Sequence, residues 1–186
     1  MAIRWRCTLC GQCCKSYTPF VLPGDVRHIL SSLHRPMSSC ITFYQAADFE
    51  NGLSADDRRY LFETKRGLVV MCLSRVLLPG DEAGCVFLNG DLCSIHTHRP
   101  LVCRQYPFQP IEPGNARVPF QLMDNPCFGV YAEDEIVDEG PVRLNYGVFQ
   151  EQQDEFMEKV ARWNEDPSSK MKDINEFLSY IGLSWA

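Results

Sequence analysis

Apolar residues recur at helical spacing in two stretches of the N-terminal third of the chain. The stripe from Val26 to Leu33 follows Pro23-Gly24-Asp25, which predicts a short helix with Asp25 as its cap. Residues 54 to 65 predict a second helix, with Ser54 as its cap and Leu61-Phe62 on the buried side.

Short apolar runs in the middle of the chain predict strands. One run covers Leu68 to Met71 and another covers Arg75 to Leu78, with a break near Leu73-Ser74 and an end at Pro79-Gly80. Residues 84 to 96 predict a hairpin, because Asn89-Gly90 is a strong turn signal. Arg117 to Met123 alternates enough to be another strand.

The C-terminal third changes to amphipathic helix. An apolar face runs from Phe149 to Trp163, and a second runs from Met171 to Ile181. Asp166-Pro167 is typical of a helix start, and Gly182 of a helix end. The terminal Trp185 is an aromatic that could anchor on a partner if it is exposed.

These elements predict an α+β fold with short strands, peripheral helices and two C-terminal amphipathic helices. With 186 residues, 45% of them hydrophobic, the chain is most simply one domain, residues 1–186. We expect residues 1–130 to form a cysteine-rich, metal-stapled core and residues 144–186 to form a helical extension packed on it.

Four cysteines lie within eight residues near the N-terminus: Cys7, Cys10, Cys13 and Cys14. Thiolates select zinc and iron–sulfur clusters, and two-residue gaps let one short loop direct several sulfurs inward. Ferredoxin-type cubane sites use a similar CxxCxxC run with a distant fourth cysteine. The motif therefore predicts a soft-metal site, with Gly11 allowing backbone N–H groups to approach a cluster sulfur.

Four later cysteines complete the candidate ligands: Cys85, Cys93, Cys103 and Cys127. Cys85 and Cys93 bracket the predicted hairpin turn and could sit on facing strands, while Cys103 follows a helix opening at Arg99-Pro100. Eight thiolates are enough for two four-thiolate sites. Adjacent side chains of an extended segment point to opposite faces, which predicts that Cys13 and Cys14 serve different sites or that one is spare.

The two remaining cysteines, Cys40 and Cys72, lie in apolar surroundings and are better explained by packing than by ligation. A secreted disulfide scaffold is disfavoured, because Met-Ala-Ile-Arg-Trp-Arg leads straight into the motif without an apolar signal segment. We expect a reducing cytoplasm, where clustered cysteines mean metal or redox chemistry. No stretch reaches the length of a membrane span.

The formal net charge of −6 argues against general nucleic-acid binding. Positive side chains beside the cysteines could offset the charge of an anionic cluster and raise its potential, and Lys15 and Arg104 are the two candidates. Of the four histidines, His28 and His34 are typical of surface groups. His96 and His98 lie between Cys93 and Cys103, where ligation or a hydrogen bond to sulfur is an alternative to an ordinary structural role.

The cysteine blocks also carry a family resemblance. The segments Cys7-x-x-Cys10-x-x-Cys13-Cys14, Cys85-Val-Phe-Leu, Cys93-Ser-Ile-His and Arg99-Pro-Leu-Val-Cys103-Arg104-x-x-Pro107-Phe108 resemble those of the CxxCxxCC family of zinc- or iron-chelating proteins, which also includes flagellin lysine N-methylases. The similarity spans roughly residues 1 to 130 and departs from the usual pattern at His96, where the family commonly has Tyr. The resemblance implies a metal site built by these cysteines.

The third cysteine at CxxC spacing favours a cubane over a zinc knuckle, which predicts an iron–sulfur cluster of the [4Fe–4S] type, one or two per chain, with zinc as the alternative cofactor. An electron-transfer or redox accessory protein with a protein redox partner is the favoured function. A protein-modifying enzyme resembling the lysine N-methylases and a structural zinc-binding module are the alternatives.

Overall fold

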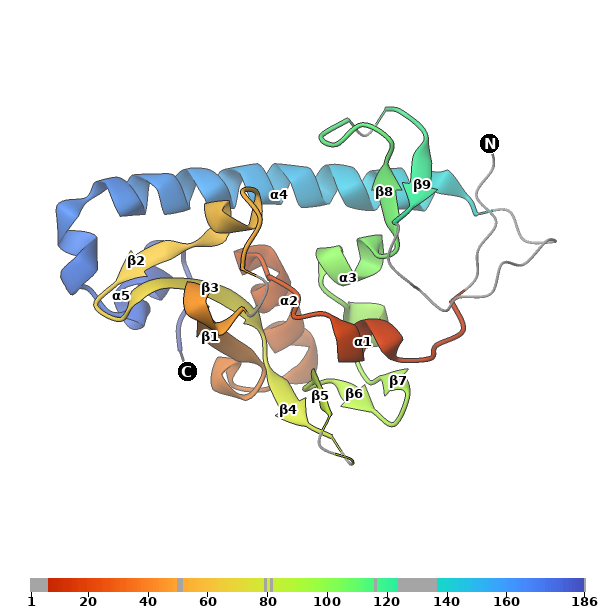
Figure 1. Cartoon of the computed structure of the whole chain (residues 1–186), viewed down its shortest axis with the longest axis horizontal. Helices are drawn as coiled ribbons and strands as arrows, with labels where there is room; N and C mark the ends of the chain where they lie inside the picture. The colour runs from red at the N-terminus through yellow and green to blue at the C-terminus, as the bar shows by residue number, and fades with distance from the viewer. Residues whose placement is uncertain are drawn as a thin grey trace. The chain divides into compact units, whose positions relative to one another are not determined.

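The computed structural model describes residues 7–49, 52–78, 80, 82–115, 117–123 and 137–185 (Figure 1). The fold is α+β as predicted, with short strands and a long C-terminal helix. Two compact units are present: unit 1 comprises residues 1–17 and 76–151, and unit 2 comprises residues 18–75 and 152–186. Each unit combines two separate stretches of the chain. The division into a core at residues 1–130 and a helical extension at residues 144–186 stays a prediction.

A three-stranded antiparallel sheet organises unit 2. Its strands are β1 (Ile41–Gln45), β2 (Phe62–Thr64) and β3 (Gly67–Leu73), in the order β1-β3-β2. The central strand β3 is buried from Val69 to Leu73, which explains its unbroken apolar sequence. The predicted strand at residues 68–71 is therefore confirmed and slightly longer.

Helices pack against this sheet within unit 2. They are α2 (Pro23–Leu33), the C-terminal part of α4 (Glu139–Glu165) and α5 (Ile174–Tyr180). The Phe177 ring of α5 stacks on Phe62 of β2 with ring centroids 3.6 Å apart, and Trp163 of α4 meets Phe177 edge-on at 5.1 Å. Aromatic rings therefore join α4 to α5 and α5 to β2.

The end of α4 is also tied to β2 by hydrogen bonds. Trp163 Nε1 donates to the Glu63 carbonyl at 2.7 Å. The Asn164 side chain accepts from Glu63 N at 2.8 Å and donates to the Leu61 carbonyl at 2.8 Å. These bonds fix the helix end on the outer side of β2.

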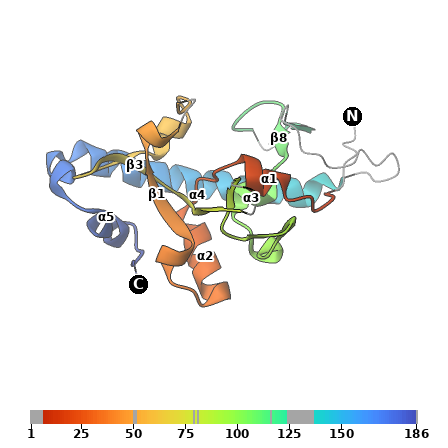
Figure 2. The ribbon, with the colours of Figure 1, turned by 60° about the horizontal axis from the view of Figure 1, so that its bottom comes forward.

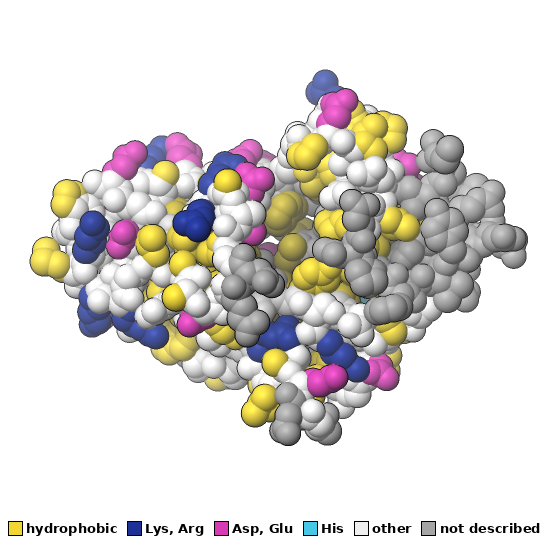
Figure 3. Space-filling model, in the orientation of Figure 1, with side chains coloured by type: hydrophobic (Ala, Val, Ile, Leu, Met, Phe, Trp, Pro, Cys, Tyr) yellow, Lys and Arg dark blue, Asp and Glu magenta, His cyan; other side chains and the backbone are white. Residues whose placement is uncertain are grey.

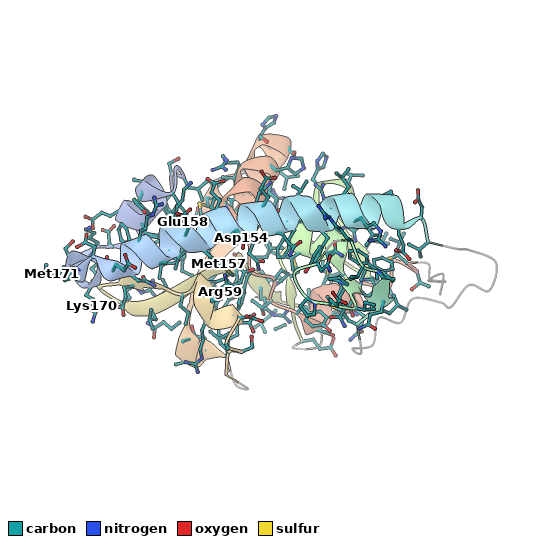
Figure 4. All side chains as sticks on the ribbon, turned by 90° about the horizontal axis from the view of Figure 1, so that it is seen from above. Arg59, Asp154, Met157, Glu158, Lys170 and Met171 are labelled. Carbon is teal, nitrogen blue, oxygen red and sulfur yellow. The ribbon has the colours of Figure 1, made fainter. Side chains whose placement is uncertain are left out.

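The amphipathic pattern predicted for α4 holds in unit 2. Met157 is buried, whereas Asp154 and Glu158 are exposed (Figure 4). The helix begins earlier than the predicted stripe, at Glu139, so it contributes residues 139–151 to unit 1 and the remainder to unit 2. Positive and negative side chains are interspersed over the sheet side of unit 2 (Figure 3).

The predicted helix at residues 54–65 is wrong. Only a 3₁₀ turn, Asp57–Tyr60, forms there, and the chain then enters β2, where Phe62 pairs with Val69. The Ser54 Oγ accepts from Asp57 N, in the first residue of this turn, at 3.0 Å, but the N-cap position is Asp56 and not the predicted Ser54. Pairing with β3 overrides the local helical pattern from Leu61 onward.

Two predicted helix starts are displaced. Asp25 lies within the first turn of α2, where its carboxylate accepts from Leu22 N at 3.1 Å, so it caps from the third helical position. Asp166-Pro167 starts a 3₁₀ turn, Pro167–Met171, and α5 is capped instead by Asp173, which accepts from Glu176 N at 3.1 Å. Trp185 is partly exposed and lies against Phe43, with ring centroids 5.5 Å apart.

Unit 1 consists of short hairpins and helices. Its strands are β4 (Arg75–Leu77, whose first residue closes unit 2), β5 (Ala83–Cys85), β6 (Leu88–Asn89), β7 (Leu92–Cys93), β8 (Phe108–Pro110) and β9 (Phe120–Leu122). The strands pair as β4-β5, β6-β7 and β8-β9, so the strand predicted from Arg117 is shorter at both ends. Its helices are α1 (Gln12–Ser16), α3 (Leu101–Gln105) and the first part of α4.

A small apolar cluster joins β8 and β9 to α4 within unit 1. Phe108 and Phe120 are buried, Tyr146 of α4 meets Phe120 edge-on at 5.6 Å, and the Arg143 guanidinium lies 5.2 Å from the Phe120 ring centre. Asn145 Nδ2 donates to the Leu101 carbonyl of α3 at 3.2 Å. Among the residues described, no helix is long and apolar enough to cross a bilayer.

Replacing Phe177 by Ala is expected to lower the free energy of unfolding by about 3–5 kcal/mol, because this fully buried ring stacks on Phe62 and meets Trp163. The matched control is Met171→Ala, whose side chain is 76% exposed and whose loss should change stability by less than about 0.5 kcal/mol. Urea unfolding of the two variants measures both. Similar losses in both would show that the aromatic stack does not hold this unit together.

Candidate metal centre

The helix α1 begins at Gln12 and includes the third and fourth cysteines of the motif, Cys13 and Cys14. Gly11, in the left-handed conformation with φ +67°, is the N-cap of α1, and its carbonyl accepts from Cys14 N at 2.9 Å and from Lys15 N at 3.2 Å. Cys13 and Cys14 are consecutive residues of this helix. The prediction that they face opposite ways assumed an extended chain, and that assumption is wrong.

Gly11 also sets how closely α1 approaches the β6-β7 hairpin. A Cβ atom at this position would lie 2.7 Å from the Asp91 carbonyl oxygen and 2.9 Å from Leu88 Cδ1, so only glycine fits. Lys15 Nζ, one helical turn on, pairs with Asp91 Oδ1 at 3.0 Å. The hairpin therefore contacts α1 on both sides of Cys13 and Cys14, and Lys15 is engaged with a carboxylate.

The predicted hairpin forms, but it carries only one of its two cysteines. Leu88 pairs with Cys93 and Asn89 with Leu92, so the turn residues are Gly90 and Asp91. Cys85 precedes the hairpin, at the end of β5. The two thiols are thus not on facing strands, contrary to the prediction.

Four thiols nevertheless meet, and we call this group the Cys14 cluster: Cys13, Cys14, Cys85 and Cys93. The Cys14 thiol is hydrogen-bonded to each of the other three. These four cysteines come from α1, β5 and β7, all in unit 1. The helix α3, which carries Cys103, lies beside α1 (Figures 1 and 2). The Cys14 cluster thus joins three stretches of the chain that local structure alone would leave apart.

Hydrogen bonding divides the cluster into one thiol that keeps its proton and two that release theirs readily. The pKa of Cys13 is lowered to about 6 and that of Cys93 to about 7, chiefly by the hydrogen bond to Cys14 and to a smaller extent by the positive charge of Arg99. The pKa of Cys14 is raised, first by its bond to Cys13 and then by those to Cys85 and Cys93 and by burial. Thiolates are the form that binds soft metals, so this donor set fits zinc or an iron–sulfur cluster.

The thiols contact one another through Cys14 and do not surround a common point. Within the described stretches of the chain, no three His, Cys, Asp or Glu side chains stand around a position that could hold an ion. The Cys14 sulfur occupies the middle of the group, so a metal bound by all four sulfurs would require it to turn aside.

The hydrogen-bond partners described for Cys14 do not include Cys7, Cys10 or Cys103. Cys7 is exposed, and its sulfur accepts from Leu9 N at 3.4 Å. Cys10 and Cys103 are half-buried, Cys103 within α3. Cys127 lies outside the described residues.

Cys40 and Cys72 are buried in unit 2, in agreement with the prediction that they pack in apolar surroundings. The Cys40 thiol donates to the Met37 carbonyl at 3.5 Å, and burial raises the pKa of both thiols. They have no part in the Cys14 cluster.

Arg99 is a functional candidate that the sequence interpretation missed. Its charge acts on Cys13 and Cys93, and its Nε donates to the His96 carbonyl at 3.0 Å. Arg104, which the sequence did single out, donates from Nε to the Arg99 carbonyl at 2.7 Å and so helps to fix the backbone of Arg99. The one available signal was the Arg99-Pro100 pair six residues after Cys93, which indicated only a helix opening.

The two histidines of this region lie in a 3₁₀ turn, His96–His98. Partial desolvation and the nearby charge of Arg99 lower the pKa of His96. A neutral imidazole is the form that ligates metal or accepts a hydrogen bond. The described contacts do not include either histidine in the Cys14 cluster, so their ligation stays a prediction.

Replacing Arg99 by Gln should raise the pKa of both Cys13 and Cys93, because a positive charge that favours their thiolates is removed. In metal-free protein the two thiols should alkylate with midpoints near pH 6 to 7, and the variant should need higher pH for the same rate. Alkylation rates against pH, assigned to each cysteine by peptide mass mapping, measure this. Arg117→Gln, an exposed change in the same unit, is the control, and coincident profiles for the two variants would contradict the role of Arg99.

Gly11→Ala should destabilise the protein more than Gly90→Ala. Both residues have positive φ, +67° and +60°, but only the added methyl group at Gly11 meets neighbouring atoms. Strain of about 1–2 kcal/mol is common to the two variants, and overpacking should add about 1–3 kcal/mol at Gly11. Denaturant unfolding gives the difference, and equal losses would mean that α1 is not held against the hairpin.

Comparison with known proteins agrees with this donor set. The model of the CxxCxxCC family, described as "Putative zinc- or iron-chelating domain", matches residues 6–128. No curated protein and no solved structure matches the chain. The matched region covers more than half of the sequence and contains all four thiols of the Cys14 cluster, as the resemblance of the cysteine blocks led us to expect. The chain therefore belongs to the CxxCxxCC family of zinc- or iron-chelating domains.

Proposed function

We propose that unit 1 is a metal–thiolate centre that holds iron as an iron–sulfur cluster and works in electron transfer, alone or as an accessory subunit of a redox complex. The observation that carries the proposal is the contact of Cys14 with Cys13, Cys85 and Cys93, which gathers four sulfurs from three chain segments. Four thiolates are the ligand set of the common two-iron and four-iron clusters. Cys13, Cys14, Cys85 and Cys93 would hold one such group.

The spacing of the N-terminal cysteines favours iron–sulfur over a zinc knuckle. A cubane-type run can divide its cysteines between two clusters, as Cys7-x-x-Cys10-x-x-Cys13-Cys14 would here, whereas zinc knuckles use paired CxxC units. Cys7, Cys10, Cys103 and Cys127 remain as candidate ligands beyond the Cys14 cluster, which leaves room for a second cluster of the [4Fe–4S] type.

Two further features suit electron transfer. Cys13 and Cys93 are half-buried, so a cluster on these sulfurs would lie close enough to the surface of unit 1 to exchange electrons with a protein partner. Arg99 supplies a positive charge beside them, and such a charge raises the potential of an anionic cluster.

A single zinc ion at the Cys14 cluster is the second candidate, favoured by how close the sulfurs lie. A tetrahedral ion with metal–sulfur bonds of about 2.3 Å places its sulfurs about 3.8 Å apart, which is within hydrogen-bonding reach for sulfur. A cubane interposes irons and sulfides and spaces its ligands more widely. The hydrogen bonds of Cys14 match the smaller spacing.

Metal and sulfide analysis of protein purified without oxygen separates the two candidates. We expect iron with about equal acid-labile sulfide, brown colour and reversible bleaching on reduction. About four irons per chain indicate one cubane and about eight indicate two. Stoichiometric zinc without sulfide would reject the iron–sulfur proposal.

The Cys14→Ser variant tests whether the Cys14 cluster is the site. It should lose the metal group held there, whereas Cys72→Ser, which changes a buried thiol of unit 2, should keep the full metal content. Equal metal content in the two variants would show that the metal is held elsewhere. Partial loss in Cys14→Ser, with the remaining signal intact, would indicate two separate sites.

A further inference from the structure

The contacts of Cys14 suit a reaction between thiols as well as metal binding. Every cysteine of the described part of the chain is a free thiol, and Cys14 is hydrogen-bonded to three of them. The fit of Gly11 against Asp91 and Leu88 and the Lys15–Asp91 ion pair hold α1 in place on both sides of Cys14. Cys14 therefore stays beside its sulfur neighbours without any rearrangement of the backbone.

Geometry and exposure indicate which of the three neighbouring thiols can form a disulfide with Cys14. Cys13 is adjacent in sequence, and consecutive Cα atoms lie only about 3.8 Å apart, below the roughly 4.4–6.8 Å that a disulfide spans. Cys85 is only 4% exposed, so an oxidant in solution cannot readily reach its sulfur. Cys93 is half-buried on the short strand β7 and contacts Cys14. It is the neighbour that combines access with a side-chain contact to Cys14 and is not adjacent to it in sequence.

We propose that a hydroperoxide oxidises Cys93 and that Cys14 then closes a Cys14–Cys93 disulfide. The Cys93 sulfur attacks one peroxide oxygen, the O–O bond breaks, and the leaving oxygen takes the thiol proton, which gives a sulfenic acid and water when the oxidant is hydrogen peroxide. The Cys14 sulfur then attacks the sulfenic sulfur, the S–O bond breaks, and the leaving hydroxyl takes the Cys14 proton and departs as a second water. In sum, two thiols lose two electrons and two protons to one peroxide.

The disulfide and metal binding exclude each other at this site. This step rests on the proposed function, because Cys14 and Cys93 would be two of the four ligands, and a metal bound to them would shield both sulfurs. Oxidation of the metal-free chain would remove half of the donor set until a reductant restores it. Metal loading of unit 1 would thus depend on the thiol redox state.

The test uses the full-length chain, reduced and freed of metal by a chelator, then treated with about one equivalent of hydrogen peroxide. Remaining thiols are alkylated and the protein is mapped by peptide mass spectrometry. We expect one linked peptide pair that joins Cys14 to Cys93, two hydrogens lighter than the reduced pair. Cys72→Ser should give the same link, because its thiol belongs to unit 2.

The Cys14→Ser variant should form no link and should instead accumulate a dimedone-reactive sulfenic acid at Cys93. A Cys14–Cys85 link, a link between two chains, or sulfinic acid at Cys93 without any disulfide in the unmodified sequence would overturn the proposal. If Cys14→Ser does not fold, the map of the unmodified protein decides alone. Metal analysis before oxidation is independent of this readout, so failure of the metal proposal and failure of the disulfide proposal are distinguishable.

Discussion

The close contact between Gly11 and the β6-β7 hairpin is the constraint on which the candidate site depends. A side chain at this position would collide with the Asp91 carbonyl and with Leu88. Because none is present, α1 can start against the hairpin, and Lys15 can reach Asp91. Cys14 is thereby placed where the sulfurs of β5 and β7 converge, and the acidity of these thiols follows from that convergence.

The sequence predicted the elements whose structure is determined by residues close together in the chain. The apolar run of β3 and a hairpin turn that includes Gly90 were both predicted, since a central strand needs apolar side chains and Gly90 takes a positive φ in the turn. The turn residues are Gly90-Asp91, one position later than the predicted Asn89-Gly90. It failed at residues 54–65, where the pattern is helical but the residues from Phe62 pair with a neighbouring strand. Non-local pairing leaves little trace in a local pattern.

The candidate site was likewise predicted only in part. The cysteines that could act were visible in the sequence, but their grouping was not. Cys13 and Cys14 are consecutive residues of a helix whose N-cap is Gly11, and Cys85 joins Cys93 through Cys14, not across a hairpin. Arg99 was overlooked because its effect acts through space, on sulfurs that are six residues away in one case and 86 in the other.

The side chains at the end of α4 have a consequence for how unit 2 behaves in a crowded solution. β2 is an edge strand, and its outward backbone groups are a template on which a strand of another molecule could align. The side chains of Asn164 and Trp163 are hydrogen-bonded to backbone groups of Leu61 and Glu63. One residue after β2, Lys65 N donates to the Lys172 carbonyl at 2.8 Å. The C-terminal segment therefore makes the hydrogen bonds that a fourth strand would make with the edge of β2, although it is not a strand itself. It protects the sheet from intermolecular strand addition along β2.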